Sequence, residues 1–386
     1  MKIQAFIIFI SIVLVFYSAV NYYIFIRGLH ALPAGKAWSI GYIILFIVLF
    51  ASYIIGRAGT SFLPLKISEF FMLAGSFWMA FMLYFFLIVL FFDVIKGIER
   101  FTGFLPEFIT SNIGKTKHFI LFISVISVSL LVLIGHINSR IIHVRTIDLV
   151  IDKAVEGRNE LQVAMFSDLH LGHLIKRNHL AKIVTKINEA DPDLVLLAGD
   201  IFDENPQIVI NEHMGREFLK LQASLGVIGV TGNHEYIGNA EIACRYLEEC
   251  GIKMLRDSSV LIDNSFYIIG REDRDKTRFS GQKRKEVSEL VADLNSAKPL
   301  ILIDHQPYEF KEKEAAGIDL SLSGHTHHGQ FFPINLITKA IFELSWGYLK
   351  KGNTHFYTSC GVGGWGPPVR LGNRPEIVIF NIKFAS

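Results

Sequence analysis

The chain has 386 residues, of which 38 are Lys or Arg and 36 are Asp or Glu, so its formal net charge is only +2. A balance this close to neutral, without a basic stripe, argues against binding to long nucleic acids. Hydrophobic residues make up 51% of the chain, which is high for a soluble protein. Cys244, Cys250 and Cys360 contain no Cys-x-x-Cys pair, so we expect small buried thiols rather than a disulfide framework.

The excess hydrophobicity lies in four apolar stretches before residue 138. They are Ile3–Ile26, Trp38–Ile55, Phe70–Phe92 and Phe119–Ile137. Each has close to the roughly 20 residues that a helix needs to cross a bilayer, and none contains Lys, Arg, Asp or Glu. We therefore predict four transmembrane helices within residues 1–139 rather than a cleaved signal peptide. A transporter is disfavoured, because the only histidine in these stretches is His136, at an end.

The orientation in the membrane is weakly encoded. Four spans place both termini on one side, where five basic residues, Lys2 among them, lie near the bilayer, against six on the other side. The first span often sets the orientation, and Arg27 and Lys36 follow it whereas only Lys2 precedes it. We therefore expect the first loop inside the cell and the C-terminal part outside the cytoplasm.

After residue 139 the apolar runs shorten and alternate with charged residues. Residues 140–159 have the alternation of an extended connector, and residues 160–386 alternate strands with helices. The predicted strands are Leu161–Phe166, Leu194–Ala198, Val227–Val230, Val260–Ile262, Phe266–Ile269, Leu300–Ile303, Leu320–Leu322, Phe356–Thr358 and Ile377–Ile382. The predicted helices are Asn178–Glu189, His213–Ala223, Ala240–Cys250 and Lys285–Leu294. This order predicts an α/β fold with a largely parallel sheet and a second, mixed sheet.

Five short polar motifs each follow a predicted strand. They are Ser167–His170, Gly199–Asp200, Gly232–Glu235, Asp304–Pro307 and Gly324–Gln330, the last of which is Gly-His-Thr-His-His-Gly-Gln. Ligands of such folds bind beyond the carboxyl ends of the strands. Each motif alone is weak evidence, because a lone histidine is usually a hydrogen-bonded core residue. Five motifs at equivalent places are hard to explain by chance.

Together the motifs supply carboxylates, imidazoles and one amide, but no thiolate. That set suits two divalent ions such as manganese, iron or zinc. A carboxylate shared by two ions about 3.5–4 Å apart can hold a bridging hydroxide, which attacks phosphorus while the ions bind phosphoryl oxygens. The residue types therefore indicate a two-metal centre that could bind a phosphoryl group, but they do not divide the ligands between the two ions.

The order Asp-x-His, Gly-Asp, Gly-Asn-His-Glu, single His and Gly-His-x-His over residues 160–384 resembles the calcineurin-like metallophosphoesterases. The segment Gly361–Arg370, which is GVGGWGPPVR, is similar to the end of their membrane-associated bacterial branch. The resemblance implies that an αββα sandwich of two mixed sheets flanked by helices follows the four predicted transmembrane helices. It also implies an integral protein of a bacterial inner or other cell membrane.

The resemblance further implies seven metal ligands. One ion would be held by Asp168, His170, Asp200 and His327. The other would be held by Asp200, Asn233, His305 and His325, with Asp200 bridging the two. His234 would not bind metal, but would lie over the phosphate and stabilise or protonate the leaving oxygen.

Four nearby residues leave alternatives open. His328 stands where many relatives have glycine, and we expect it to face solvent, with contact to substrate or to the ligands as alternatives. His173 could line the rim of the pocket or lie on the surface. Arg370 and Arg374 could each grip a phosphate bidentately, or form a structural salt bridge in their loop.

These patterns predict a membrane-anchored, metal-dependent phosphoesterase that cleaves phosphoester or pyrophosphate bonds. Its substrates would be phosphorylated small molecules or lipids, because a membrane anchor keeps the enzyme in the plane of lipid-linked substrates. One alternative is a nucleotide phosphodiesterase or nuclease on the same scaffold. Another is a non-catalytic, metal-stabilised binding module, which the presence of both Asp200 and His234 disfavours.

Overall fold

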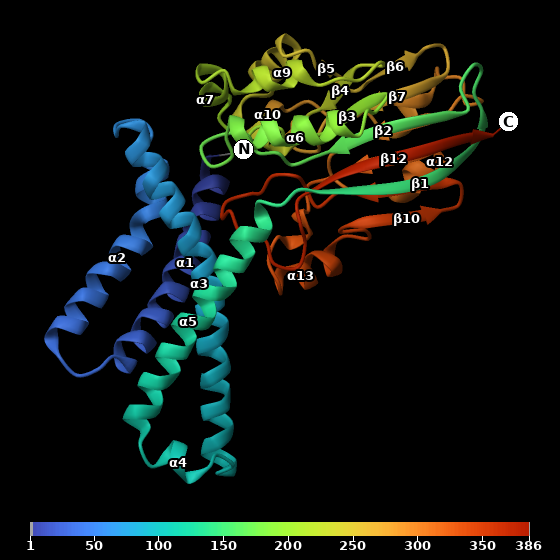
Figure 1. The fold of residues 1–386 in the computed structure, drawn as a ribbon. Helices are drawn as coiled ribbons and strands as arrows, with labels where there is room; N and C mark the ends of the chain where they lie inside the picture. The colour runs from blue at the N-terminus through green and yellow to red at the C-terminus, as the bar shows by residue number, and fades with distance from the viewer. Residues whose placement is uncertain (1–2, 386) are drawn as a thin grey trace. The chain divides into compact units, whose positions relative to one another are not determined.

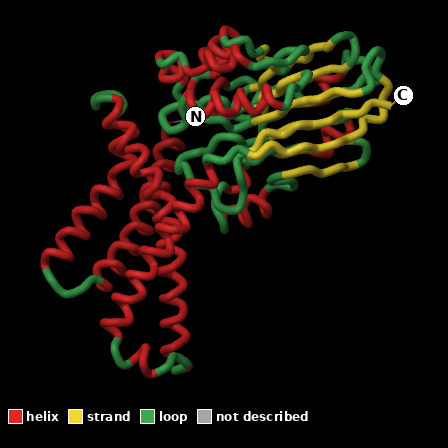
Figure 2. Tube along the Cα trace, in the orientation of Figure 1, coloured by secondary structure: helices red, strands yellow, loops and turns green. Residues whose placement is uncertain are grey.

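The computed structural model describes residues 3–385 (Figures 1 and 2). Lys2, one of the basic residues counted for the orientation, lies outside them. The chain forms two compact units. One contains the residues up to Ile137 and the short segment Gly366–Val369, and the other contains Asn138–Trp365 and the residues from Arg370 onward. The strands of the described chain all belong to the second unit.

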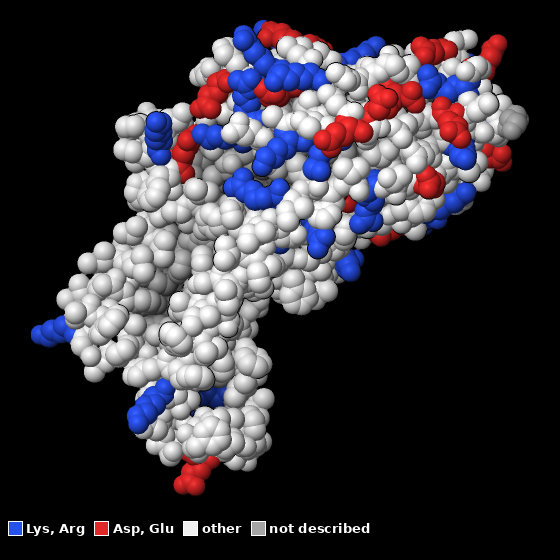
Figure 3. All heavy atoms as spheres, viewed as in Figure 1, with Lys and Arg blue, Asp and Glu red and all other residues white. Residues whose placement is uncertain are grey.

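Four long helices make up most of the first unit, and a four-residue helix, α4 (Glu107–Thr110), precedes the last of them. They are α1 (Ile3–Ala31), α2 (Lys36–Gly59), α3 (Leu65–Thr102) and α5 (Ile113–Ser139). All four are long and apolar enough to cross a membrane, as predicted, and only 17–22% of their most apolar windows is buried within the protein. Few charged side chains appear on these helices in the view of Figure 3, whereas they cover the second unit. Such outward apolar faces suit contact with lipid.

The observed helices are longer than the predicted apolar stretches and include charged residues. Arg27 of α1 and Asp93 of α3 lie just beyond the predicted stretches and form an ion pair of 2.7 Å. The Tyr23 hydroxyl also donates to Asp93, at 2.5 Å. Because the two charges neutralise each other, the pair gives no support to a transport pathway through the helices.

Two six-stranded sheets form the second unit. The first has the order β1 (His143–Ala154), β12 (Glu376–Ala385), β2 (Glu160–Phe166), β3 (Leu194–Ala198), β4 (Val227–Val230) and β5 (Lys253–Met254). The second has the order β10 (Gly347–Lys351), β11 (Thr354–Thr358), β9 (Leu320–Ser323), β8 (Leu300–Ile303), β7 (Phe266–Gly270) and β6 (Ser258–Ile262). Both sheets are mixed, because the β12–β2, β10–β11 and β6–β7 pairs are antiparallel and the other pairs are parallel.

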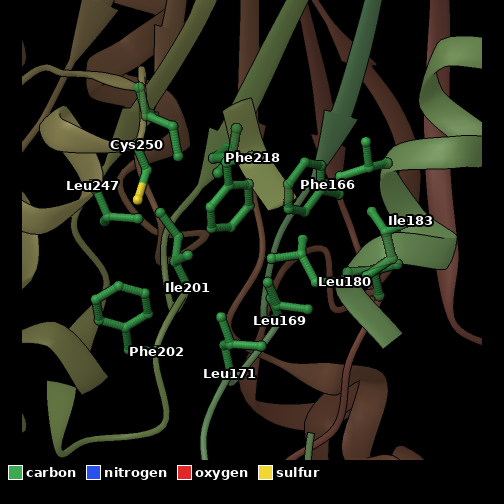
Figure 4. Packing of buried hydrophobic residues seen from close by; sticks show 14 of the residues in the cluster. Phe166, Leu169, Leu171, Leu180, Ile183, Ile201, Phe202, Phe218, Leu247 and Cys250 are labelled. Carbon is green, nitrogen blue, oxygen red and sulfur yellow. The ribbon is translucent and has the colours of Figure 1, made fainter. Parts of the chain in front are cut away.

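Hydrophobic layers fix the αββα arrangement. One buried cluster joins the facing sides of the two sheets, for example Val163 of β2 and Ile301 of β8. A second cluster packs the other face of the first sheet, with Phe166, against Ile183 of α6 (Arg177–Glu189) (Figure 4). A third packs the outer face of the second sheet under the short helix α11 (Val287–Val291). Successive side chains of a strand point to opposite faces, so a strand buried on both sides is a continuous apolar run.

Two predicted helices are confirmed and two need correction. The predictions for Asn178–Glu189 and Ala240–Cys250 match α6 and α9 (Ala240–Glu249). The helix predicted at His213–Ala223 is wrong: the region contains α7 (Pro206–Asn211) and a 3-10 helix, η1 (Met214–Lys220). His213 separates these two, because its left-handed φ of 50° cannot continue an α-helix. The helix predicted at Lys285–Leu294 is present but shorter than predicted, because only α11 is helical there.

The remaining helices of the second unit are short and lie in loops. They are α8 (Asn233–Gly238), α10 (Lys276–Ser280), α12 (Phe310–Ala315), the 3-10 helix η2 (His327–Gly329) and α13 (Ile334–Ile341). Of these, α8 and η2 contain predicted site residues, so the sheets position the site through very short connections.

Candidate metal centre

The five polar motifs occupy the loops after β2, β3, β4, β8 and β9. The backbone in these loops leaves the strands sharply, with positive φ angles at Asp168, His170, Asp200, His325 and His327 (46–72°). Such angles are uncommon outside glycine and cost on the order of 1 kcal/mol each. The strained residues persist because the surrounding strands and hydrogen bonds hold them. Strain of this kind concentrates at functional sites.

The structure brings together three of the ligands that the resemblance implies for one ion. The Nε2 atoms of His170 and His327 lie 3.0 Å apart, and His327 Nε2 lies 3.5 Å from Asp168 Oδ1. The fourth predicted ligand, Asp200, places Oδ2 at 3.9 Å from His170 Nε2. Asp168, His170 and His327 each offer a donor atom within 4.8 Å of the others, so these residues could hold a metal ion.

The predicted ligands of the second ion form a neighbouring group. Asp200, His305 and His325 offer donor atoms within 4.8 Å of one another, and His305 Nε2 lies 3.1 Å from Asp200 Oδ2. The Asn233 side-chain oxygen lies 2.8 Å from His325 Nδ1. Asp200 therefore lies between the two groups, with imidazole nitrogens of both within 4 Å of its Oδ2.

The ring nitrogens of His170 and His327 are suited to binding a cation. Burial, together with neighbouring positive charge, holds the pKa values of His170 and His327 well below the usual range. Both rings are therefore neutral and present lone pairs to the same space. Within the described chain, their buried Nδ1 atoms have no hydrogen-bond partner. Converging neutral imidazoles beside two buried carboxylates are the donor set of a borderline divalent ion.

In the second group, the His305 ring is charged and the His325 ring is neutral. Burial opposes protonation of His305, but the carboxylates of Asp200, Asp168 and Asp273 outweigh it and raise the pKa of His305 well above its usual value. Its Nδ1 donates to the Ala198 carbonyl at 2.7 Å. Burial, followed by the charge of His305, lowers the pKa of His325 to about 3. The carboxylates thus attract positive charge to the position where a second cation would lie.

His234, the predicted catalytic residue, lies beside the first group. Its ring is 4.5 Å from the His170 ring, centroid to centroid, in an edge-on arrangement. Its Nδ1 lies 3.6 Å from Asp203 Oδ1, and its backbone N–H donates to Asp200 Oδ1 at 2.8 Å. Asp203 was not singled out from the sequence, although it stands three residues after Asp200 in Gly-Asp-Ile-Phe-Asp.

Glu235, the last residue of the Gly-Asn-His-Glu motif, holds two site loops together. Its buried carboxylate accepts four backbone N–H groups, from Asp200 (3.1 Å), Ile201 (2.9 Å), Phe202 (2.9 Å) and Gly232 (2.7 Å). Burial and the nearby Asp200 charge raise the pKa of Glu235, while the N–H groups of Phe202 and Gly232 oppose the rise. The sequence pattern does not reveal this role of Glu235, because the loop it binds is 33–35 residues away.

A buried ionic cluster positions the loop that contains His305. The preceding residue, Asp304, is fully buried and lies 2.9 Å from Arg284, 3.0 Å from Lys313 and 3.5 Å from Arg271. Burial acts to raise the pKa of Asp304, but these three cations outweigh it and lower that pKa to about 2. The ionised carboxylate therefore fixes the end of β8, directly before the predicted ligand.

The structure corrects the expectation for His328 and shows what Arg370 and Arg374 contact. His328 does not face solvent: it is buried, its Nδ1 lies 2.9 Å from Ser345 Oγ, and its left-handed φ of 47° turns its ring inward. Arg370 is 1% exposed and donates to the Gly363 and Cys360 carbonyls, so it stabilises its own loop. Arg374 Nη1 lies 3.2 Å from His143 Nε2.

The remaining minor expectations concern exposure. His173 is half-buried, between the two alternatives given for it. The cysteines Cys244, Cys250 and Cys360 are free and buried, as expected. Burial raises the pKa of the Cys360 thiol well above its usual value, so this cysteine is not a nucleophile near neutral pH.

The sequence comparisons support a metal-dependent phosphoesterase. Residues 161–329 match the sequence model of the family described as calcineurin-like phosphoesterase, and the chain carries a domain of that family. An "Uncharacterized metallophosphoesterase" of Campylobacter jejuni is 29% identical over 98% of this chain and 99% of that protein. A "Transmembrane protein with metallophosphoesterase domain" of Danio rerio is 29% identical over 62% of this chain and 57% of that protein.

Among solved structures, the 5'-nucleotidase precursor from Thermus thermophilus aligns with a TM-score of 0.33 and 16% identity. The alignment covers 57% of this chain and 55% of that chain. A superposition this weak adds nothing to the family match. The four helices of this chain that are long and apolar enough to cross a membrane indicate that it is associated with a membrane.

Proposed function

We propose that the protein is a membrane-anchored phosphohydrolase with a two-metal centre. The observation that carries this proposal is the position of Asp200, whose Oδ2 lies 3.1 Å from His305 of one ligand group and 3.9 Å from His170 of the other. The other proposed ligands are Asp168, His327, Asn233 and His325. Two divalent ions held there, such as manganese, iron or zinc, would supply an activated water and neutralise phosphoryl charge.

The chain's own groups would bind the phosphate and handle the proton. His234 is the proposed acid, and the Asp203 carboxylate, 3.6 Å from its Nδ1, would orient the ring. A histidine aligned in this way can donate a proton to the leaving oxygen. The backbone N–H of His234 donates to Asp200, so the proposed acid and the proposed bridging ligand are fixed to each other.

The proposed substrates are phosphoesters or pyrophosphates of small molecules or of membrane lipids. The four helices support the lipid part, because anchored enzyme and lipid substrate diffuse in one plane. We propose an integral protein of a bacterial inner or other cell membrane, with the catalytic part outside the cytoplasm. The proposed divisions are residues 1–139 for the membrane region, 140–159 for the connector and 160–386 for the catalytic domain.

The decisive experiment is His234→Ala in the full chain, loaded with Mn²⁺ and assayed on a chromogenic phosphodiester. We expect turnover to fall about 10²–10⁴-fold, the usual contribution of a general acid, while metal content measured by elemental analysis stays unchanged. The control is His143→Ala, a histidine of the same unit outside the ligand groups. Undiminished turnover in His234→Ala would refute the mechanism, and no turnover by the unchanged chain would favour a non-catalytic binding module.

The lipid part has a separate test. The unchanged chain is offered a soluble chromogenic diester, a lipid phosphate and a lipid pyrophosphate, each with defined metals. We expect the two lipids to be hydrolysed faster than the soluble compound. If only the soluble diester is cleaved, the catalytic proposal stands and the lipid proposal is wrong.

A further inference from the structure

Helix α13 (Figure 1) exposes large apolar side chains, Leu336, Ile337 and Ile341 among them. At 100° per residue, Leu336, Ile337 and Ile341 fall within an arc of about 140° around the helix axis, so they share one face. These three side chains are 54%, 58% and 61% exposed, while Asn335 and Thr338 on the opposite side are half-buried. A surface helix normally buries its apolar stripe. Here the apolar stripe faces outward.

This helix is tied to the metal centre at both ends. At its start it packs on η2, where a Cβ at Gly329 would come within 2.6 Å of the Asn335 backbone nitrogen. After its end, the Phe342 ring lies 6.1 Å from the ring of His325. Ser345 then accepts a hydrogen bond from Thr326 through its carbonyl, at 2.5 Å. The exposed apolar face therefore lies on a short segment that directly follows the loop with two proposed metal ligands, His325 and His327.

Two exposed aromatic residues extend the apolar face. Phe332, just before α13, is 56% exposed, and Trp365 is 59% exposed. Gln330, in the loop that leads into α13, accepts a hydrogen bond from the Trp365 backbone N–H at 3.0 Å and donates one to the Trp365 carbonyl at 3.2 Å. The residue after Trp365 begins the segment Gly366–Val369, which belongs to the unit of the long apolar helices.

We propose that the outward face of α13, together with Phe332 and Trp365, inserts into the surface of the lipid bilayer. We call these residues, Phe332, Leu336, Ile337, Ile341 and Trp365, the docking face. The docking would bring phospholipid headgroups to the adjacent metal centre. The substrate part of this inference rests on the proposed function, whereas the docking itself does not.

The chemistry of the docking face favours a bilayer over a protein partner. The chain has four helices apolar enough to cross a membrane, and the last of them, α5, leads directly into β1 of the second unit. Helix α13 contains Lys339 and no acidic residue, which suits an anionic lipid surface. Aliphatic side chains on one face with a basic residue beside them are typical of helices that lie in the membrane interface. Tryptophan is likewise enriched at that depth.

The test places a fluorescent probe on the docking face of the full chain in nanodiscs of phosphatidylcholine and phosphatidylglycerol. Ile337→Cys is labelled with an environment-sensitive dye, and the native cysteines do not compete because they are buried. The matched control is Leu261→Cys, an exposed position that pairs with Tyr267 at the start of β7, away from the strand ends that bear the metal centre.

We expect the dye at position 337 to be blue-shifted and quenched by doxyl-labelled lipid, and the dye at position 261 to be neither. Equal quenching at both positions would overturn the proposal. A blue shift that depends on protein concentration, without quenching by lipid, would also overturn it, because the face would then contact a second copy of the chain.

A kinetic readout connects docking to substrate. In the triple variant Leu336→Ser, Ile337→Ser and Ile341→Ser, we expect hydrolysis of a lipid phosphate in nanodiscs to fall roughly tenfold, because apolar insertion is lost. Hydrolysis of a soluble chromogenic diester should be as in the unchanged chain. An equal loss on both substrates would contradict the docking role. If the unchanged chain cleaves nothing, the proposed function fails while lipid quenching still decides the docking.

Discussion

Glu235 offers the sharpest test of how the site loops are held. Its carboxylate accepts two N–H groups on each oxygen: those of Asp200 and Gly232 on Oε2, and those of Ile201 and Phe202 on Oε1. Glu235→Gln replaces one oxygen by an NH₂ group, which can only donate. Two backbone N–H groups would then face a donor inside a fully buried site.

The expected cost follows from the number of bonds lost. A buried hydrogen bond to a charged group contributes about 1.5–3 kcal/mol, so losing two should destabilise the second unit by roughly 3–6 kcal/mol. That is a large share of the ~5–15 kcal/mol that usually separates folded from unfolded domains. For a domain of this size, about 2–4 °C of melting temperature accompanies each kcal/mol. We therefore expect a fall of at least about 6 °C.

The assay is thermal unfolding of the full chain in detergent, followed by intrinsic fluorescence at one scan rate, with chelator present to remove any contribution from metals. The control is Glu241→Gln, the same chemical change at a carboxylate that is 73% exposed and pairs with Arg256. An exposed pair contributes less than about 1 kcal/mol. If Glu235→Gln melts within about 2 °C of Glu241→Gln, the reasoning about the four N–H groups is wrong.

Three further outcomes are expected. Mn²⁺ at about 100 times its dissociation constant should stabilise the second unit by about 2.7 kcal/mol, and no rise in melting temperature with Mn²⁺ would count against the metal centre. The ammonium of Lys220, followed by Arg177, lowers the pKa of Glu217 against the opposing effect of burial. The stability that Glu217 contributes is therefore present above the usual glutamate pKa and is lost as the pH falls through the lowered pKa. Glu217→Gln should thus melt earlier than the unchanged chain near neutral pH, with a gap that shrinks in acid. Arg370 donates to the Gly363 carbonyl and to Asn373, which in turn donates to the backbone carbonyl of His327. Arg370→Lys should therefore lower kcat and melting temperature with KM unchanged, whereas a rise in KM alone would indicate contact with substrate.

The strands that position the site were predictable because they are buried on both faces. The predicted strand Leu194–Ala198 coincides with β3, in which every residue is buried. In contrast, β10 went unpredicted because its residues alternate between half-buried and exposed, and its sequence, Gly-Tyr-Leu-Lys-Lys, contains no apolar run. Helix α13 was missed because it is only 8 residues long and its apolar residues do not face a core.

The sequence pattern predicted which residues form the site, but not which residues hold the loops of the site in place. Strand-end motifs are enough to nominate Asp168 and His325, because the ends of parallel strands converge. Glu235 holds the loop that contains Asp200, and nothing in the sequence indicates that this loop lies next to Glu235. The burial of His328 depends on a left-handed backbone angle that the sequence pattern does not reveal for a histidine. Such contacts follow from tertiary packing rather than from local pattern.

Burial and charge in this centre can coexist only if positive charge enters it. Asp168 and Asp200 are 0% and 2% exposed, and an ionised carboxylate buried without a partner is costly. Within the chain itself the balancing charge is on His305, whose pKa these carboxylates raise. A divalent cation would bring more charge and would use the lone pairs of the neutral imidazoles.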